Sequence, residues 1–498
     1  MRIFTAISLL CLALGGLLSC NQLTSICRSY PQAESFPDQN IILFNTLDSG
    51  GHSIPMPVAM QRILLDSANQ VLNQAEKKPL KIKQWCPCDS ALVLLEGKDL
   101  DQLQINGKEV ASSTGGKAGV GGQPPYGIKF NPTDGSLDWP QLIGAGSPNY
   151  VLSLPFAPAF ERKNNSPTLF PLPPTNPALT PFIIAVMDTG LDLNVYEPIK
   201  SVLWVNTQEA TGADHDGNGL VNDVSGWNFV QNINLPFDSN GHGSLVTSLI
   251  HEQLLAVRRA ALPVRFMVLK TFSANGKGTL FDNLCALSYA RQMKAKLINA
   301  SWGFYSPTKS RLLDYFIRQL NEEGVTLVAA AGNKDEHLEK YPCGWVDESV
   351  YRNLDSNPFW PAAFSTLYPN VITVTTLDSI KKEFKMFGPA NGPFTVCSAQ
   401  NYSSRAVNVG VFNNTKGSVP HCGVLDITTL RDQTDVKYGS SFAAPVITGK
   451  LAGQLGPNWP GNDRDVLFHK LASTAPTILK THSSLKDKIR HQYYVNRH

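Results

Sequence analysis

The sequence predicts an α/β fold of three layers, with helices on both faces of a mostly parallel central sheet and a small mixed accessory region before it. Short apolar runs rich in β-branched residues show little alternation of polar and apolar side chains, which is typical of strands buried on both faces. These runs alternate with helical patterns, as in sheets with helical connections. The runs are residues 182–187, 265–269, 296–300, 325–331 and 371–375, and helical patterns follow Gly241, Thr279, Thr308 and Gly439.

The chain has 498 residues, a net charge of +3 and 17% charged residues. That length is enough for one large domain and an accessory region. Because the charge is nearly balanced, no basic field indicates nucleic acid as a partner. The sequence carries no signal for the oligomeric state.

Residues 1–19 are predicted to be an export signal. Arg2 precedes the apolar run 3–18, which is short for the about 20 residues of a membrane-spanning helix. The stretch Leu17-Leu18-Ser19-Cys20 resembles the lipoprotein box of bacteria. This resemblance implies that Cys20 becomes the lipidated first residue and anchors the chain to a membrane of the bacterial cell envelope, at the outer membrane or a periplasmic face. A simple membrane helix is the alternative.

The rest of the chain divides into four predicted parts by composition. Within the first part, the pattern predicts a helix at 58–75 and a strand at 91–95. The second part is rich in glycine and proline, which favours an extended linker. The four parts are an accessory region at 20–113, a linker at 114–178, the main domain at 179–476 and a basic, solvated helical tail at 477–498.

Export would place the cysteines where disulfides form. Apart from Cys11 and Cys20, the chain has seven cysteines, so at least one is expected to stay free. We expect a disulfide between Cys27 and either Cys86 or Cys88, with a metal site made by these three as the alternative. Cys285 lies in an apolar helical pattern and is expected to be a buried thiol.

Residues 438–445 predict a tight turn that delivers the hydroxyl of Ser441 to the first turn of a buried helix. Gly439 provides conformational freedom, and Pro445 is expected in that first turn, where its missing N–H is tolerated. Unpaired N–H groups there could stabilise the negative oxygen of a tetrahedral acyl intermediate. A serine that simply caps a helix is the alternative.

Three other polar residues complete the chemistry of acyl transfer. Asp188 and Asn333 follow predicted strands, and sites in parallel sheets lie beyond the carboxyl ends of the strands. His242 lies between glycines at the start of a mostly apolar helical pattern. Each alone is typical of a cap or a turn, but together with Ser441 they supply a nucleophile, a base, a carboxylate and an oxyanion donor.

With these residues in place, the chain resembles the subtilisin-like serine peptidases, or subtilases, over about residues 179–476. The matching motifs, in the order of the family, are 188–190, 240–243, 330–333 and 439–445. The resemblance implies a subtilisin-like fold in which Ser441 attacks a peptide carbonyl, His242 transfers the proton and Asp188 holds the imidazole. It implies that Asn333 donates to the oxyanion and that the chemistry needs no cofactor.

The same resemblance implies where polypeptide substrates bind. The segment Ser301-Trp302-Gly303 would pair with an extended substrate backbone, and Ala331 and Gly332 would help to wall the first specificity pocket. The chain departs from the family at Ser244, Leu245, Ser440 and Phe442, and its loops at 336–357 and after Cys397 are long or divergent.

A candidate metal site lies in residues 214–223. Its alternating oxygen-bearing side chains around glycine suit a hard cation such as calcium, in a structural role. Asp, Asn and Gly also form simple turns, which is the alternative. The candidate ligands are Asp214, Asp216, Asn218 and Asp223.

The sequence therefore predicts a serine endopeptidase, anchored by lipid at the cell envelope. The rival hypothesis is a catalytically inactive envelope lipoprotein that uses the same fold for binding. By analogy with the family, residues 21–178 could contain an inhibitory propeptide whose removal would release the mature peptidase from the anchor.

Overall fold

The structure is a computed structural model, and it describes most of the chain beyond the predicted signal. No helix in this described part is long and apolar enough to cross a membrane. The described residues are 33–48, 52–97, 105–108, 128–143, 146–154, 180–194, 197–209, 212–257, 264–333, 351–379, 394–397, 399–413, 423–425 and 437–498.

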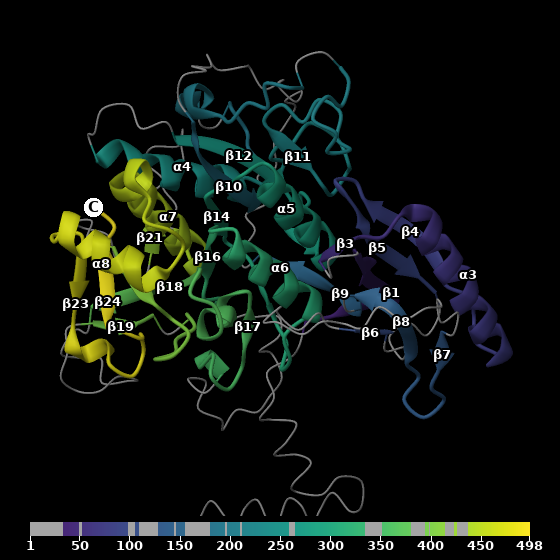
Figure 1. The fold of residues 1–498 in the computed structure, drawn as a ribbon. Helices are drawn as coiled ribbons and strands as arrows, with labels where there is room; N and C mark the ends of the chain where they lie inside the picture. The colour runs from purple at the N-terminus through teal and green to yellow at the C-terminus, as the bar shows by residue number, and fades with distance from the viewer. Residues whose placement is uncertain are drawn as a thin grey trace, which may run out of the picture.

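A large, mostly parallel sheet forms the centre of the fold, as predicted (Figure 1). Its strand order is β11-β12-β10-β14-β16-β18-β20-β24-β23, and β19 pairs with β18. Neighbours are parallel from β11 to β24, whereas β19 and β23 are antiparallel to their partners. The strands are β10 (Phe182–Asp188), β11 (Gly226–Asn228), β12 (Val264–Lys270), β14 (Leu297–Ala300), β16 (Thr326–Ala330), β18 (Val371–Ser379), β19 (Phe394–Val396), β20 (Val409–Phe412), β23 (Leu479–Thr481) and β24 (Tyr493–Asn496).

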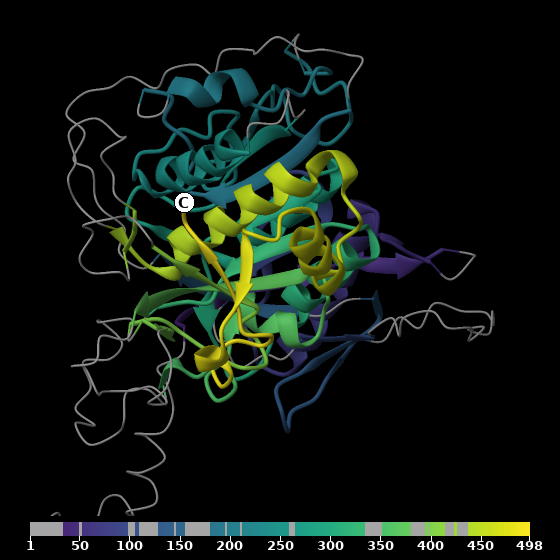
Figure 2. The ribbon, with the colours of Figure 1, turned by 90° about the vertical axis from the view of Figure 1, so that its left-hand side faces the viewer.

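Helices cover both faces of this sheet, which confirms the three layers. The residues of β10 alternate between two cores: Ile184 packs with α4 and α7, whereas Met187 packs with α5 and α6. Figure 2 views the face that α7 covers. The helices are α4 (His242–Ala256), α5 (Leu280–Gln292), α6 (Arg311–Glu322), α7 (Ser440–Leu455) and α8 (Arg464–Thr474).

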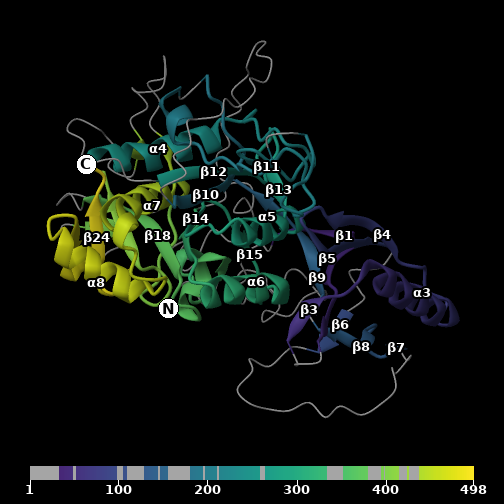
Figure 3. The same ribbon diagram turned by 45° about the horizontal axis from the view of Figure 1, so that its top comes forward.

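The accessory region forms a second sheet that packs against α5 and α6 (Figures 1 and 3). Its order is β13-β9-β1-β5-β4, and the predicted helix is α3 (Val58–Gln74). The edge strand β13 (Lys277–Thr279) comes from the main domain and pairs antiparallel with β9, so one sheet joins the two parts. The accessory strands are β1 (Ser35–Leu43), β4 (Lys81–Cys86), β5 (Asp89–Glu96) and β9 (Gly146–Ser153), with β2 (Asn45–Leu47), β3 (Ser53–Pro55), β6 (Ile105–Lys108), β7 (Lys129–Phe130) and β8 (Leu137–Ile143) in smaller sheets.

Two predicted segments differ from the structure. The linker prediction is wrong for residues 129–153, because β7, β8 and β9 form there and join the accessory sheets. The tail 477–498 is not a solvated helix, because β23 and β24 extend the main sheet and bury Val495 completely. The predicted signal and residues 155–178 lie outside the described residues.

The predicted disulfide is also wrong for Cys86 and Cys88, since both thiols are free and buried. Their sulfur atoms lie 3.7 Å apart, and the Cys88 thiol contacts the carbonyl of Cys285 on α5. Burial raises the pKa of all three thiols. Cys285 is a buried free thiol, as predicted, whereas Cys397 is disulfide-bonded. Cys27 lies outside the described residues.

Candidate active site

The structure brings Asp188, His242 and Ser441 into one hydrogen-bonded line. His242 Nδ1 lies 2.8 Å from Asp188 Oδ1, and His242 Nε2 lies 3.2 Å from Ser441 Oγ. Because an ionised carboxylate only accepts, Nδ1 carries the proton and Nε2 can accept from the serine hydroxyl. All three residues are at most 1% exposed, so little water competes for these contacts.

Asp238 fixes the start of α4 and therefore the position of His242. Its carboxylate accepts from the backbone N–H groups of Gly241 and Ser244 and from the hydroxyls of Thr189 and Ser244. A carboxylate at a helix N-terminus also matches the positive end of the helix dipole. Ser244, one of the departures from the family, thus performs a supporting role through its hydroxyl.

Gly243 lets α4 approach the turn after Asp188. A Cβ atom at this position would lie only 2.3 Å from the carbonyl oxygen of Gly190. Any larger residue would therefore push the helix away from the carboxylate that orients His242. Phe442 is another departure from the family. Its ring packs beside the ring of His242, and the two ring centroids lie 5.0 Å apart.

Lys270 is a buried cation at this site that the sequence did not single out. It is 3% exposed, lies in register with Asp188 on the neighbouring strand, and donates from Nζ to the carbonyl of Thr189 at 2.5 Å. Burial lowers the pKa of Lys270, while the negative charges of Asp238 and Asp188 oppose that shift. The two carboxylates favour the charged form of Lys270, which burial disfavours. The sequence concealed this contact, because a lysine at the end of a strand usually indicates a solvent-exposed edge.

Ser441 is the second residue of α7, a helix that begins directly after Gly439, whose φ is +130°. Gly439 provides the predicted freedom, because side-chain-bearing residues rarely adopt that angle. Pro445 is the sixth residue of the helix, so its prediction as a first-turn residue is wrong. It cannot donate to the carbonyl four residues earlier. That carbonyl, of Ser441, instead accepts from Ser301 Oγ at 2.7 Å.

Asn333 presents an unpartnered donor beside the hydroxyl of Ser441. Its Oδ1 accepts from the N–H and the hydroxyl of Ser440, at 2.7 and 3.1 Å. Its buried Nδ2 has no hydrogen-bond partner within the described residues. A buried donor without an acceptor carries a desolvation cost, and an oxyanion hole is one kind of site that holds such a donor. The N–H of Ser441, in the first turn of α7, has no acceptor within the helix.

The predicted substrate-binding residues lie at the carboxyl ends of β14 and β16, which are parallel neighbours. Ser301 and Trp302 are buried, at 0% and 1% exposed with backbone and side chain counted together. Gly303 and Gly332 both lie against the ring of Phe359, a residue the sequence did not point to.

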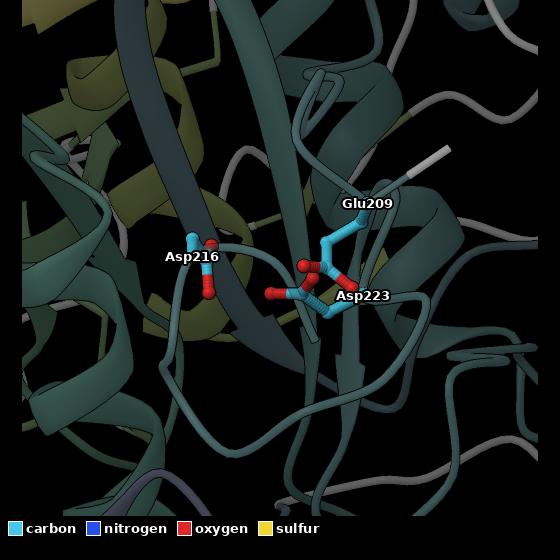
Figure 4. Close-up of side chains that lie close together, drawn as sticks. All are labelled: Glu209, Asp216 and Asp223. Atoms are coloured by element: carbon cyan, nitrogen blue, oxygen red, sulfur yellow. The ribbon is translucent and has the colours of Figure 1, made fainter. Parts of the chain in front are cut away.

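The candidate metal loop gathers a partly different set of carboxylates than predicted. Oxygen atoms of Glu209, Asp216 and Asp223 all lie within 4.8 Å of one another, and Figure 4 shows the three side chains. Asp214 does not belong to this cluster, and its carboxylate accepts the backbone N–H groups of Gly217, Asn218 and Gly219. Asn218 lies alongside and donates to Asp216 and Asp223.

This cluster fits a hard cation. Glu209 and Asp223 are completely buried, and burial raises the pKa of Asp223. Three carboxylates so close together repel one another, and a cation with oxygen ligands would neutralise them. The sequence did not indicate Glu209, because it precedes the loop. Only the fold places it next to Asp216 and Asp223.

The family of the chain follows from its match to the Subtilase family model over residues 180–491. This match covers more than half of the chain, which therefore belongs to the subtilase family, a family of serine-type peptidases with a subtilisin-like fold.

Subtilisin-like protease 1 of Plasmodium berghei (strain Anka) is 25% identical over 321 residues, which are 63% of this chain and 48% of that protein. Subtilisin-like protease 1 of Plasmodium falciparum (isolate 3D7) is 28% identical over 200 residues, 39% of this chain and 28% of that protein. The chain thus spans about half, or less, of these relatives. The structure of fervidolysin from Fervidobacterium pennivorans, a keratinolytic enzyme related to subtilisin, has 17% identity and a TM-score of 0.49 over 94% of this chain and 62% of that one.

Proposed function

We propose that the chain is an active serine endopeptidase that hydrolyses extended polypeptides. The observation that carries this proposal is the continuous hydrogen-bonded line from Asp188 through His242 to Ser441, next to the unpartnered Nδ2 of Asn333. A fold retained only for binding has no physical need to bury this arrangement at the cost of an unsatisfied donor.

The proposed mechanism uses the hydrogen bonds of this site. Ser441 Oγ attacks the carbonyl carbon while His242 Nε2 takes its proton, and Asp188 stabilises the imidazolium that forms. Nδ2 of Asn333 and the N–H of Ser441 donate to the oxygen that becomes negative. His242 then returns the proton to the leaving amine, and water hydrolyses the acyl-enzyme by the same route.

A serine-reactive fluorophosphonate probe tests this proposal. The wild-type chain should take up the label, and Ser441→Ala should lose it. The matched control is Ser440→Ala, whose hydroxyl contacts Asn333 rather than His242, and this variant should still be labelled. A folded wild-type chain that takes no label, even after limited proteolysis of the accessory region, would support the inactive binding lipoprotein instead.

A structural calcium ion at Glu209, Asp216 and Asp223 is part of the proposal. The ion would hold the loop before α4, and it takes no part in the chemistry. Chelation should lower the Tm of the wild-type chain, and added calcium should restore it. Asp223→Asn should abolish most of this dependence, whereas Asp214→Asn, outside the cluster, should retain it.

We also propose lipidation at Cys20 and location at the bacterial cell envelope, supported by the sequence pattern alone. Incorporation of labelled fatty acid that disappears in Cys20→Ala would support this proposal. A mature chain that starts elsewhere and carries no lipid would refute it.

A further inference from the structure

The substrate residue that precedes the cleaved bond has a defined place in this site. Its carbonyl carbon must lie near Ser441 Oγ, with the oxygen directed to Asn333 Nδ2. Gly332 comes directly before Asn333, and Ser301 Oγ contacts the carbonyl of Ser441. The resemblance to the subtilases implies that Ala331 and Gly332 wall the pocket for the side chain of this substrate residue. The segment with Gly303 follows β14, the parallel neighbour of β16, and so lies beside that wall.

The ring of Phe359 contacts both of these glycines. A Cβ atom at Gly303 would lie 2.2 Å from Cε1 of Phe359, and one at Gly332 would lie 2.9 Å from Cδ1. One ring in contact with both segments spans the space between them. Phe359 is only 6% exposed, so it packs into this space rather than lying across its mouth.

Neighbouring residues hold the ring in place. Phe359 begins β17 (Phe359–Trp360), which pairs antiparallel with β15 (Phe304–Tyr305). The ring centroid of Tyr305 lies 4.8 Å from that of Phe359, and the Tyr305 hydroxyl donates to the carbonyl of Asn333 at 3.2 Å. Asn401 Nδ2 joins the Tyr305 hydroxyl to the carbonyl of Ala331, at 2.6 and 2.8 Å. Displacing Phe359 would disturb this whole network.

We propose that Phe359 fills the pocket for the residue before the cleaved bond and restricts the substrates to polypeptides with glycine, alanine or serine there. This inference rests on the proposed peptidase activity and specifies its substrate class. A bulky side chain would have to displace a packed aromatic ring, whereas a hydrogen or a methyl group would not. Discrimination by the shape of an apolar pocket is worth about tenfold to a few hundredfold in kcat/KM.

The test uses quenched fluorescent peptides that differ only at this position, with alanine, leucine or phenylalanine. The full chain, before and after limited proteolysis, should cleave after alanine at least about tenfold faster, in kcat/KM, than after leucine or phenylalanine. Phe359→Leu should narrow this ratio, and Phe359→Ala should narrow it further or reverse it. The matched control is Phe304→Ala, on the paired strand, whose ring stacks on Tyr150 instead, and it should keep the wild-type ratio.

Labelling of Ser441 by the fluorophosphonate separates the two ways to fail. A labelled wild-type chain that cleaves after phenylalanine as well as after alanine overturns the assignment of Phe359 and leaves the peptidase proposal intact. A chain that takes no label overturns both. If Phe359→Ala does not fold, the ratio of kcat/KM after alanine to kcat/KM after phenylalanine in the wild-type chain still tests the proposal.

Discussion

Ser301→Ala tests how the nucleophile is held. In a regular helix the carbonyl of Ser441 would accept the N–H of residue 445, but proline has none. Ser301 Oγ supplies the missing donor at 2.7 Å, and the two serines are 0% and 1% exposed. The alanine variant therefore leaves a buried carbonyl without this donor.

The expected cost is that of an unsatisfied buried acceptor, about 1 to 3 kcal/mol in the free energy of unfolding. Denaturation by urea would measure it in a Ser441→Ala background, in which the chain cannot cleave itself. In the active chain, kcat should also fall, because the first turn of α7 carries the reacting hydroxyl. A fall of about tenfold corresponds to about 1.4 kcal/mol of transition-state stabilisation.

Pro445→Ala provides a rescue, because an alanine restores the N–H that a helix offers to the carbonyl of Ser441. The double variant of Ser301 and Pro445 should lose less stability than the sum of the single variants, with a coupling energy of about 1 kcal/mol. Single effects that add to within about 0.5 kcal/mol would refute the proposed exchange of donors.

Two further predictions concern the oxyanion and the acidic end of α5. Asn333→Leu should lower kcat by about a hundredfold to a thousandfold with little change in KM, measured on peptide substrates. A fall confined to KM would contradict its role as an oxyanion donor. Burial raises the pKa of Asp282 to about 7, so the folded chain holds this proton more tightly than the unfolded chain does. Asp282 therefore contributes stability in acid that is lost as the pH rises through about 7. Asp282→Asn should weaken the fall in Tm between about pH 4 and 7 and should be the more stable chain at pH 8. A Tm profile identical to that of the wild type would refute this.

The strands of the central sheet could be predicted because burial on both faces leaves a local signature. The run that became β10 is apolar throughout, and the fold divides its residues between two cores. The candidate triad could be proposed because short motifs surround Asp188, His242 and Ser441. In each case the information lies within a few consecutive residues.

The features that were missed depend on contacts between distant parts of the chain. Phe359 has no local signal, because its significance lies in two glycines that precede it by 56 and 27 positions. β24 extends the main sheet by pairing with β20. The sequence did not indicate this strand, because the basic residues around it suggested a solvated helix. A disulfide at Cys86 or Cys88 was predicted because an exported chain meets an oxidising compartment. In the structure both thiols are free, and they are buried where the accessory region packs against α5.

The strand pairing between β9 and β13 has a consequence for how a processed form of this protein would behave. A single cut within residues 155–178 would sever the chain but leave the joint sheet and its shared core intact. The two fragments would separate on a denaturing gel and still migrate together in gel filtration. Before the cut, the tether keeps the accessory part at a high effective concentration, and afterwards only dilution and affinity decide how long it stays. The nick would thus convert an intramolecular contact into a two-chain complex with a lifetime of its own.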